Sequence, residues 1–307
     1  FILFEGGKEI NLRVLNKVKI TVGMLATVGV VISTLIVGLA SGKVFGLPIL
    51  TALLLGAVIA STDPAALIPV FKQVTIKDKI KQTVVSESAF NDAVGAILVS
   101  TLLAVVTSGE FSAIESIKEL VISTVVGIGT GIIVGYILTA LVSDKRVGIF
   151  HSYAPIMSVL KVALAYEIAT MLHGSGYMAV FIAGLISGNK KLFGLWIPDV
   201  DFHSDHCFSE NIGSLARMAI FVVLGTQVNL EALAKYWAPS LLIVFVLMFI
   251  ARPVVVLIAT IFDKNAKWSF REKLFMMWVR ETGVIPAALS GIIVSMKVPG
   301  YEIISSV

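Results

Sequence analysis

The chain has 307 residues, of which 57% are hydrophobic and 14% are charged, and its mean hydropathy is +0.95. Soluble globular domains carry about 25% charged residues, so this composition excludes an ordinary soluble protein. A single cysteine, Cys207, excludes an internal disulfide. The sequence pI is about 9.1, but we expect no nucleic-acid partner, because membrane topology accounts for the basic residues.

Long apolar segments predict an all-α fold, a polytopic bundle of transmembrane helices in a lipid bilayer. A spanning helix needs about 18 or more apolar residues. In chain order, we expect spans at 20–42, 46–71, 83–107, 116–143, 150–172, 175–188, 207–226, 237–262 and 271–295, with partial segments at 1–7 and 299–307. The segment 175–188 is short for a crossing. Because the chain opens at Phe1 with FILFEGG, we expect 1–307 to be one membrane domain truncated at its N-terminus.

Basic residues gather in alternate connections between these spans, at 8–19, 72–81, 145–146, 190–191 and 264–273. The intervening connections hold only isolated lysines: Lys43, Lys118, Lys235 and Lys297. By the positive-inside rule, the basic connections of this cell-membrane protein face the cytoplasm.

The connection at 189–206 is expected to be a solvated cytoplasmic loop. A metal site is the alternative for its acidic and histidine residues, Asp199, Asp201, His203, Asp205 and His206. Their spacing matches no standard ligand pattern.

Ionisable side chains inside spans are costly, and they usually line a water-filled path or pair with one another. The expected spans contain Glu5, Asp63, Glu87, Asp92, Lys161, Glu167, Arg217, Arg252, Arg280 and Glu281. So many buried charges indicate an interior polar route, which favours a transporter. For Lys161, Glu167 and Arg217 we expect structural pairing.

Two spans are expected to be broken helices. Proline lacks a donor N–H and clashes with the carbonyl four residues earlier, and interrupted helices in two halves of a chain often mark a transporter's central site. The interruptions are Ser61-Thr62-Asp63-Pro64 and Glu281-Thr282-Gly283-Val284-Ile285-Pro286. Asp63 and Arg280 would compensate the dipoles of the half-helices. Ordinary proline kinks are the alternative, and Arg252-Pro253 is a third kink candidate.

The segment 86–92 carries the most informative chemistry. Positions three and four apart share a helix face, so Ser88, Asn91 and Asp92 present a hydroxyl, an amide and a carboxylate together, with Glu87 on the flank. This cluster suits a dehydrated monovalent cation, and a proton on the same carboxylate would expel that cation. Such competition is sufficient for exchange if the site faces one side at a time. A self-satisfying polar network is the alternative.

These motifs resemble those of sodium/proton antiporters of the cation:proton antiporter superfamily, NhaP-type branch. The resemblance is carried by Phe4-Glu5-Gly6-Gly7, Ser61-Thr62-Asp63-Pro64, Glu87-Ser88-Ala89-Phe90-Asn91-Asp92, and Arg280 with Gly283 and Pro286. It implies inverted repeats, two crossed unwound helices, a dimerisation domain and a homodimer. It also implies a mobile core domain, with elements near 46–107 and 207–295, and a role in pH homeostasis.

The resemblance also implies roles for individual residues. Asp92 would be the carboxylate shared by H⁺ and by Na⁺ or K⁺, with Ser88, Glu5 and the Thr62 carbonyl as further ligands. Asn91 would bond to the unwound segment at Thr62, and Glu87 would form an ion pair with Arg280. An Asn-Asp pair is associated with electroneutral one-for-one exchange. No catalytic residues and no cofactor are implied beyond the transported ions.

Two alternatives of different classes stay open beside the antiporter, for which Na⁺ is the preferred cation over K⁺ or Li⁺. One is a cation channel or ligand-gated K⁺ efflux system on the same fold. The other is an intramembrane enzyme: Asp63 and Asp92 could mimic a protease dyad, although the Gly-x-Gly-Asp motif is absent and no histidine lies mid-span.

Overall fold

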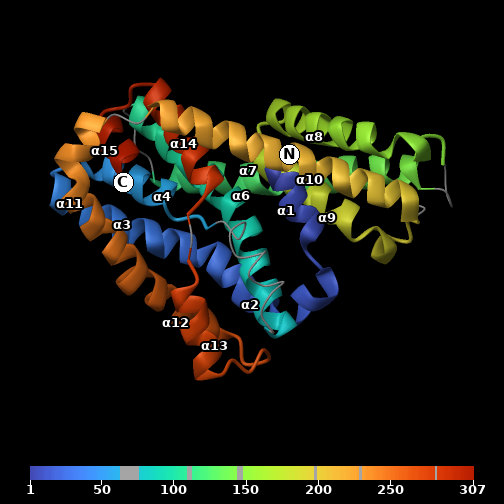
Figure 1. Cartoon of the computed structure of the whole chain (residues 1–307), viewed down its shortest axis with the longest axis horizontal. Coiled ribbons are helices and arrows are strands. Elements are labelled where there is room, and N and C mark those ends of the chain that lie inside the picture. The colour runs from blue at the N-terminus through green and yellow to red at the C-terminus, as the bar shows by residue number, and fades with distance from the viewer. Residues whose placement is uncertain (63–75, 109–112, 144–147, 197–198, 228–229, 281) are drawn as a thin grey trace. The chain divides into compact units, whose positions relative to one another are not determined.

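The computed structural model describes residues 1–62, 76–108, 113–143, 148–196, 199–227, 230–280 and 282–307. Within these ranges all regular structure is helical (Figure 1). In chain order the helices are α1 (Ile2–Glu9), α2 (Leu12–Ala26), α3 (Val28–Phe45), α4 (Ile49–Val58), α6 (Asp78–Ser108), α7 (Ala113–Val142), η1 (His151–Tyr153), α8 (Ala154–Met171), α9 (Gly176–Gly188), η2 (Lys190–Phe193), α10 (Asp199–Gln227), α11 (Leu230–Val246), η3 (Leu247–Ala251), α12 (Arg252–Phe262), α13 (Phe270–Trp278), α14 (Val284–Ser295) and α15 (Tyr301–Ser306).

Five helical stretches of the described chain are long and apolar enough to cross a membrane: Leu12–Phe45, Asp78–Thr107, Leu120–Val142, Ala154–Met171 and Leu230–Phe262. Shorter apolar helices are Ile49–Val58, Gly176–Gly188 and Val284–Ser295. The expectation of a multi-pass helical membrane protein is confirmed. The short helices coincide with the segment expected to be short and with the two spans expected to be broken.

The chain forms two compact units. Unit 1 comprises residues 1–12 and 113–219, and unit 2 comprises residues 13–112 and 220–307. Unit 2 contains the segment 46–107 and most of the segment 207–295, both expected in a core domain, whereas residues 207–219 belong to unit 1.

Unit 1 packs its helices through glycines that allow close backbone approach. Helix α9 contacts α1, α7 and α8. A Cβ atom at Gly7 would lie 2.8 Å from the backbone nitrogen of Leu185, and one at Gly131 would lie 2.5 Å from the carbonyl oxygen of Ala179. The hydrophobic effect does not drive helix association in lipid. Close packing at small residues instead stabilises the helix contacts through dispersion.

One expectation for unit 1 is wrong. Helix α10 begins at Asp199, so most of the segment expected as a solvated loop is helical, and Asp205 on α10 is buried. Its carboxylate accepts a hydrogen bond from Lys8 at 2.7 Å and another from Ser158. The polar residues were mistaken for a loop because their partners lie on distant helices. Among the described residues, no group of His, Cys, Asp and Glu could hold a metal ion.

Both expected interruptions in unit 2 coincide with helix ends. Helix α4 ends at Val58, and α13 ends at Trp278, followed by Val279 in an extended conformation (φ −76°, ψ 96°). Helix α14 then begins at Val284. Asp63, Pro64 and Glu281 lie outside the described residues.

The third proline does not break its helix. Pro253 follows the π-helical turn η3 and sits in the first turn of α12, which continues to Phe262. Proline cannot donate to the carbonyl four residues earlier, and a π-helical turn commonly absorbs such a defect within an otherwise continuous helix.

Residues within or next to three basic connections meet in unit 2, around Glu272 and Trp268. Lys77 and Lys79 donate to the Glu272 carboxylate at 3.0 and 2.8 Å, and the indole of Trp268 donates to the Thr21 hydroxyl at 2.8 Å. The contacts join residues near 8–19, 72–81 and 264–273, as expected if these connections lie on the same side of a membrane.

Glu272 joins these contacts to the start of α13. It forms a capping box with Ser269, which satisfies two of the free N–H groups at a helix start. Burial by itself would raise the pKa of the Glu272 carboxyl. Hydrogen bonds from Lys79, the Ser269 backbone and Lys77 outweigh burial and lower this pKa to about 2.

We expect Glu272→Gln to lower the melting temperature in detergent at pH 7, with a loss on the order of 1–2 kcal/mol. Glutamine retains the capping box but loses both ion pairs. Because the folded pKa lies below the ordinary 4.5, the stabilisation is complete above about pH 4.5 and is lost as pH falls towards 2. The difference from the unsubstituted protein should therefore be the same at pH 7 and pH 5. The exposed Glu302→Gln is the matched control, and equal melting temperatures for the two variants would contradict this account.

Candidate cation-binding site

Helix α6 carries the predicted site residues on one buried face. Glu87, Ser88, Asn91 and Asp92 are each at most 7% exposed. Ser88, Asn91 and Asp92 share a face because α6 is continuous through this segment. All four belong to unit 2.

Thr62, just beyond the end of α4, is held by two of these side chains. The Thr62 N–H donates to Asn91 Oδ1 at 3.2 Å, and Asn91 Nδ2 donates to the Thr62 hydroxyl at 2.8 Å. The Ser88 hydroxyl donates to the Thr62 carbonyl. Side chains of α6 thereby satisfy backbone groups that helix termination leaves without helical partners. The Asn91 contact is the one that the family resemblance implied.

The candidate ligand oxygens for a cation are those of Ser88, Thr62 and Asp92. A hydroxyl that donates one hydrogen bond retains lone pairs, and a carbonyl oxygen has two. The Ser88–Thr62 bond therefore leaves acceptor capacity on both oxygens. Neutral oxygens and a carboxylate are the ligand types that hard cations prefer. These oxygen types suit a dehydrated monovalent cation, and the Asp92 carboxylate could instead carry a proton.

Glu5, the fourth predicted ligand, belongs to unit 1 and is engaged in an ion pair. Arg217 on α10 donates to its carboxylate at 2.5 Å. A Cβ atom at Gly213 would collide with this carboxylate, so glycine provides the space for it on α10. The expected structural pairing of Arg217 is confirmed.

The expectation that Glu87 forms an ion pair with Arg280 is wrong: its partner is a different arginine. Glu87 pairs with Arg252, whose Nη1 and Nη2 donate to its two carboxylate oxygens, the second at 3.0 Å. Arg252 also donates from Nε to the Met276 carbonyl at 2.8 Å and from Nη2 to the Val279 carbonyl at 3.2 Å. It therefore joins α6 to the end of α13. Sequence reasoning counted Arg252 among the charges within spans and as a kink candidate, but it assigned this arginine no partner.

Arg280 instead binds the end of α4. Its Nη2 donates to the carbonyl oxygens of Ile59 at 2.8 Å and Ala60 at 3.0 Å. A cation there complements the negative end of the helix dipole, as expected for Arg280. Asp63, its expected counterpart, lies outside the described residues.

A double-mutant cycle distinguishes the two arginines. Arg252→Met leaves the buried Glu87 carboxylate without its cation, so we expect a loss of about 3–5 kcal/mol, measured as thermal or denaturant unfolding in detergent. Adding Glu87→Gln should recover much of this loss, because the uncompensated charge is gone.

Arg280→Met is the matched control for this cycle. Its partners are carbonyl oxygens, so Glu87→Gln should not rescue it. Rescue of Arg280→Met without rescue of Arg252→Met would contradict the pairing.

Known proteins resemble this chain in sequence and in fold. The family model described as "Sodium/hydrogen exchanger, transmembrane" matches residues 1–307. Na(+)/H(+) antiporter 1 of Methanocaldococcus jannaschii is 34% identical over 300 residues, covering 94% of this chain and 68% of the relative. The K(+)/H(+) antiporter NhaP of Alkalimonas amylolytica is 32% identical over 298 residues, covering 94% of this chain. The chain spans about half, 49%, of that relative's length.

A solved structure shows the same fold. The sodium proton antiporter MjNhaP1 from M. jannaschii at pH 8 aligns with a TM-score of 0.84 and 30% sequence identity. The alignment covers 100% of this chain and 80% of that one. The predicted fold and the predicted resemblance are confirmed. This chain belongs to the transmembrane sodium/hydrogen exchanger family.

Proposed function

We propose that this chain forms the membrane domain of a secondary active antiporter that exchanges a monovalent cation for H⁺. The observation that carries the proposal is the contact between α6 and Thr62, which places Ser88 and Asn91 on the backbone at the end of α4. Asp92 lies buried on the same face of α6. The family membership supports the reaction class.

The proposed ligands are the Asp92 carboxylate, the Ser88 hydroxyl and the Thr62 carbonyl. Burial disfavours the charged form of a carboxylate. The Asp92 carboxylate therefore binds either a proton or a cation, and either one neutralises its charge. One carboxylate releases one proton for each monovalent cation bound, so the cycle moves no net charge. Asn91 holds Thr62 in place, while Asp63, Glu87 and Arg280 support the site.

Glu5 is a conditional part of this proposal. Its carboxylate is held by Arg217 in unit 1, so it would serve a cation only after exchanging that partner. An ion pair that stays closed leaves Glu5 out of the proton balance and preserves electroneutral exchange.

Alternating access follows if unit 2 is the mobile core. Asp92, Ser88 and Thr62 all belong to this unit, so a cation bound to them would move with it as one body. The proposed cycle carries the cation in one direction and the proton in the other.

Location and assembly complete the proposal. We place the protein in the cell membrane with its basic connections in the cytoplasm, and the meeting of Lys77, Lys79 and Trp268 at one end of unit 2 supports that topology. A homodimer is proposed from the family resemblance.

The rival classes have less support. The relatives are named as antiporters, which favours coupled exchange over a channel and over an intramembrane enzyme. Relatives carry both Na(+)/H(+) and K(+)/H(+) names. We propose Na⁺ first because the solved structure is named a sodium proton antiporter, with K⁺ or Li⁺ as alternatives.

Asp92→Asn tests the exchange group. The substitution is nearly isosteric, so the protein should fold, but it removes the titrating carboxylate. In proteoliposomes containing a pH-sensitive dye, cation-dependent proton movement should fall to background. Ser88→Ala should retain exchange with about tenfold weaker apparent cation affinity, as expected for about one lost polar contact. Full exchange by Asp92→Asn would exclude Asp92 as the shared carboxylate.

The charge balance is tested by comparing Na⁺, K⁺ and Li⁺ in the same proteoliposomes, with and without an imposed membrane potential. Electroneutral exchange predicts rates that do not depend on the potential for whichever cation is transported. A potential-dependent cation flux without proton movement would instead indicate the channel alternative.

A further inference from the structure

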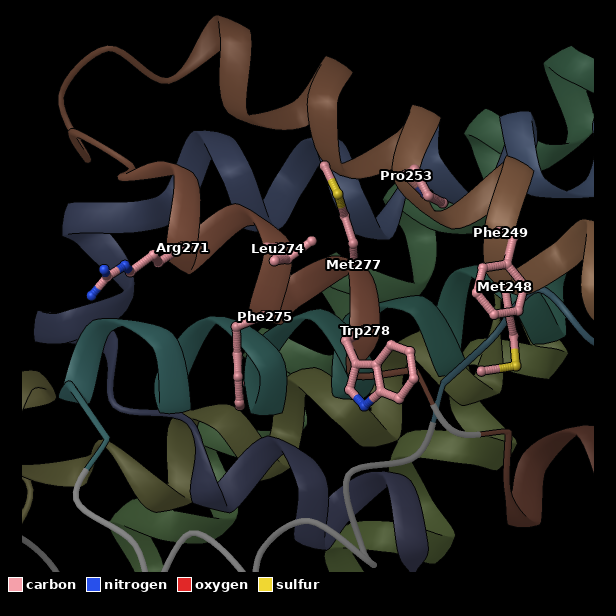
Figure 2. A pocket seen from close by; sticks show the side chains of 8 residues that line it. All are labelled: Met248, Phe249, Pro253, Arg271, Leu274, Phe275, Met277 and Trp278. Carbon is pink, nitrogen blue, oxygen red and sulfur yellow. The ribbon is translucent and has the colours of Figure 1, made fainter.

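Unit 2 has a groove with two walls. One wall is formed by η3 and the start of α12, and the other by helix α13. The volume of the groove is about 600 Å³, within the range of roughly 300–1,000 Å³ that is typical of small-molecule sites. Met248, Phe249, Leu274, Met277, Trp278 and Arg271 line it (Figure 2). The groove is separate from the Asp92 face of α6 and has no role in the proposed exchange.

The lining is amphipathic along its length. Figure 2 shows Arg271 at one end of the groove, and Met248 and Phe249 at the other. Arg271 is the only charged residue of the lining. It is exposed and has no hydrogen bond or ion pair within the described part of the chain. A cation thus marks one end of an otherwise apolar groove.

The apolar walls are open to the surroundings. Trp278 is 71% exposed, Leu274 is 54% exposed and Phe249 is 51% exposed. In a chain with membrane-capable helices, apolar side chains exposed in this way are expected to face lipid. In a membrane protein the available apolar partner is an acyl chain.

The groove runs from the basic end of unit 2 to the membrane-capable stretch Leu230–Phe262. Arg271 lies in the first turn of α13, next to the basic end of unit 2, whereas Phe249 belongs to the membrane-capable stretch Leu230–Phe262. Trp278 is seven residues further along α13 than Arg271, about 10 Å at the helical rise. Arg271 would therefore lie near the headgroups and Trp278 among the acyl chains.

Charges around Arg271 favour an anion. The one acidic side chain beside it in sequence, Glu272, is already engaged by Lys77 and Lys79. Lys264 and Lys267, in the preceding connection, are exposed. Arginine binds phosphate through paired N–H groups, and basic residues near a membrane attract anionic lipids.

We propose that this groove binds one anionic phospholipid, with an acyl chain between Phe249 and Trp278 and the phosphate on Arg271. Charge complementarity selects this occupant: a zwitterionic lipid carries no net charge to match Arg271, and a wholly apolar partner would leave it unpaired. Because Trp278 immediately precedes the interruption at Val279, the bound lipid would also hold α13 against α12.

Brominated lipids test the contact directly, because bromine quenches tryptophan fluorescence at short range. The full chain in detergent would be titrated with phosphatidylglycerol or phosphatidylcholine carrying the same brominated acyl chains. The Trp278→Phe variant identifies the Trp278 part of the signal. Brominated phosphatidylglycerol should quench the fluorescence of Trp278 at a lower lipid concentration than brominated phosphatidylcholine does. Arg271→Gln should weaken the phosphatidylglycerol titration about fivefold, the effect of about one basic contact.

Two variants keep the result interpretable. Lys264→Gln removes a neighbouring charge outside the groove lining and should weaken the phosphatidylglycerol titration less than Arg271→Gln does. Arg271→Lys retains the charge and should retain part of the preference, which provides a test if Arg271→Gln fails to fold.

Three outcomes would overturn the proposal. They are equal quenching by the two lipids in the unsubstituted chain, a headgroup preference that survives Arg271→Gln, and no quenching of Trp278 by either lipid. The last would indicate that protein covers the groove.

Discussion

The proposed cation site depends on one constraint: backbone that leaves the helical conformation at membrane depth must find hydrogen-bond partners within the protein. Helix α4 ends at Val58, and Arg280 satisfies the carbonyls of Ile59 and Ala60 that follow. Thr62 uses its N–H, hydroxyl and carbonyl to bond to α6. Since an unsatisfied buried polar group costs several kcal/mol, these contacts decide whether the interrupted helix can exist in the membrane.

The same contacts assemble the chemistry. Asn91 accepts from the Thr62 N–H and donates to the Thr62 hydroxyl. An ionised aspartate in its place could only accept, so an amide is the better residue for this paired contact. The amide also adds no charge beside Asp92. The structural requirement of the interrupted helix therefore keeps a second carboxylate out of position 91, and the Glu87 carboxylate on the same face is paired with Arg252. This leaves Asp92 as the carboxylate that we propose for one-for-one exchange.

Sequence reasoning predicted the helical membrane fold, both interruptions and the grouping of Ser88, Asn91 and Asp92, because hydropathy, proline chemistry and helical spacing are local properties. It failed where the answer depended on which distant helices meet. Arg252 and Arg280 are both buried cations, and only tertiary packing assigns Glu87 to Arg252. Likewise, Asp205 was expected in solvent, whereas in the structure it lies on α10 and forms an ion pair with Lys8.

Proton release on cation binding measures the central claim most directly. Purified protein in weakly buffered detergent solution would be titrated with NaCl, and with KCl or LiCl in parallel. The pH and the heat of binding would be measured together. We expect close to one proton to be released for each cation bound, and neither heat nor proton release for Asp92→Asn. Saturable cation binding without proton release throughout the working pH range would contradict competition for a single carboxylate.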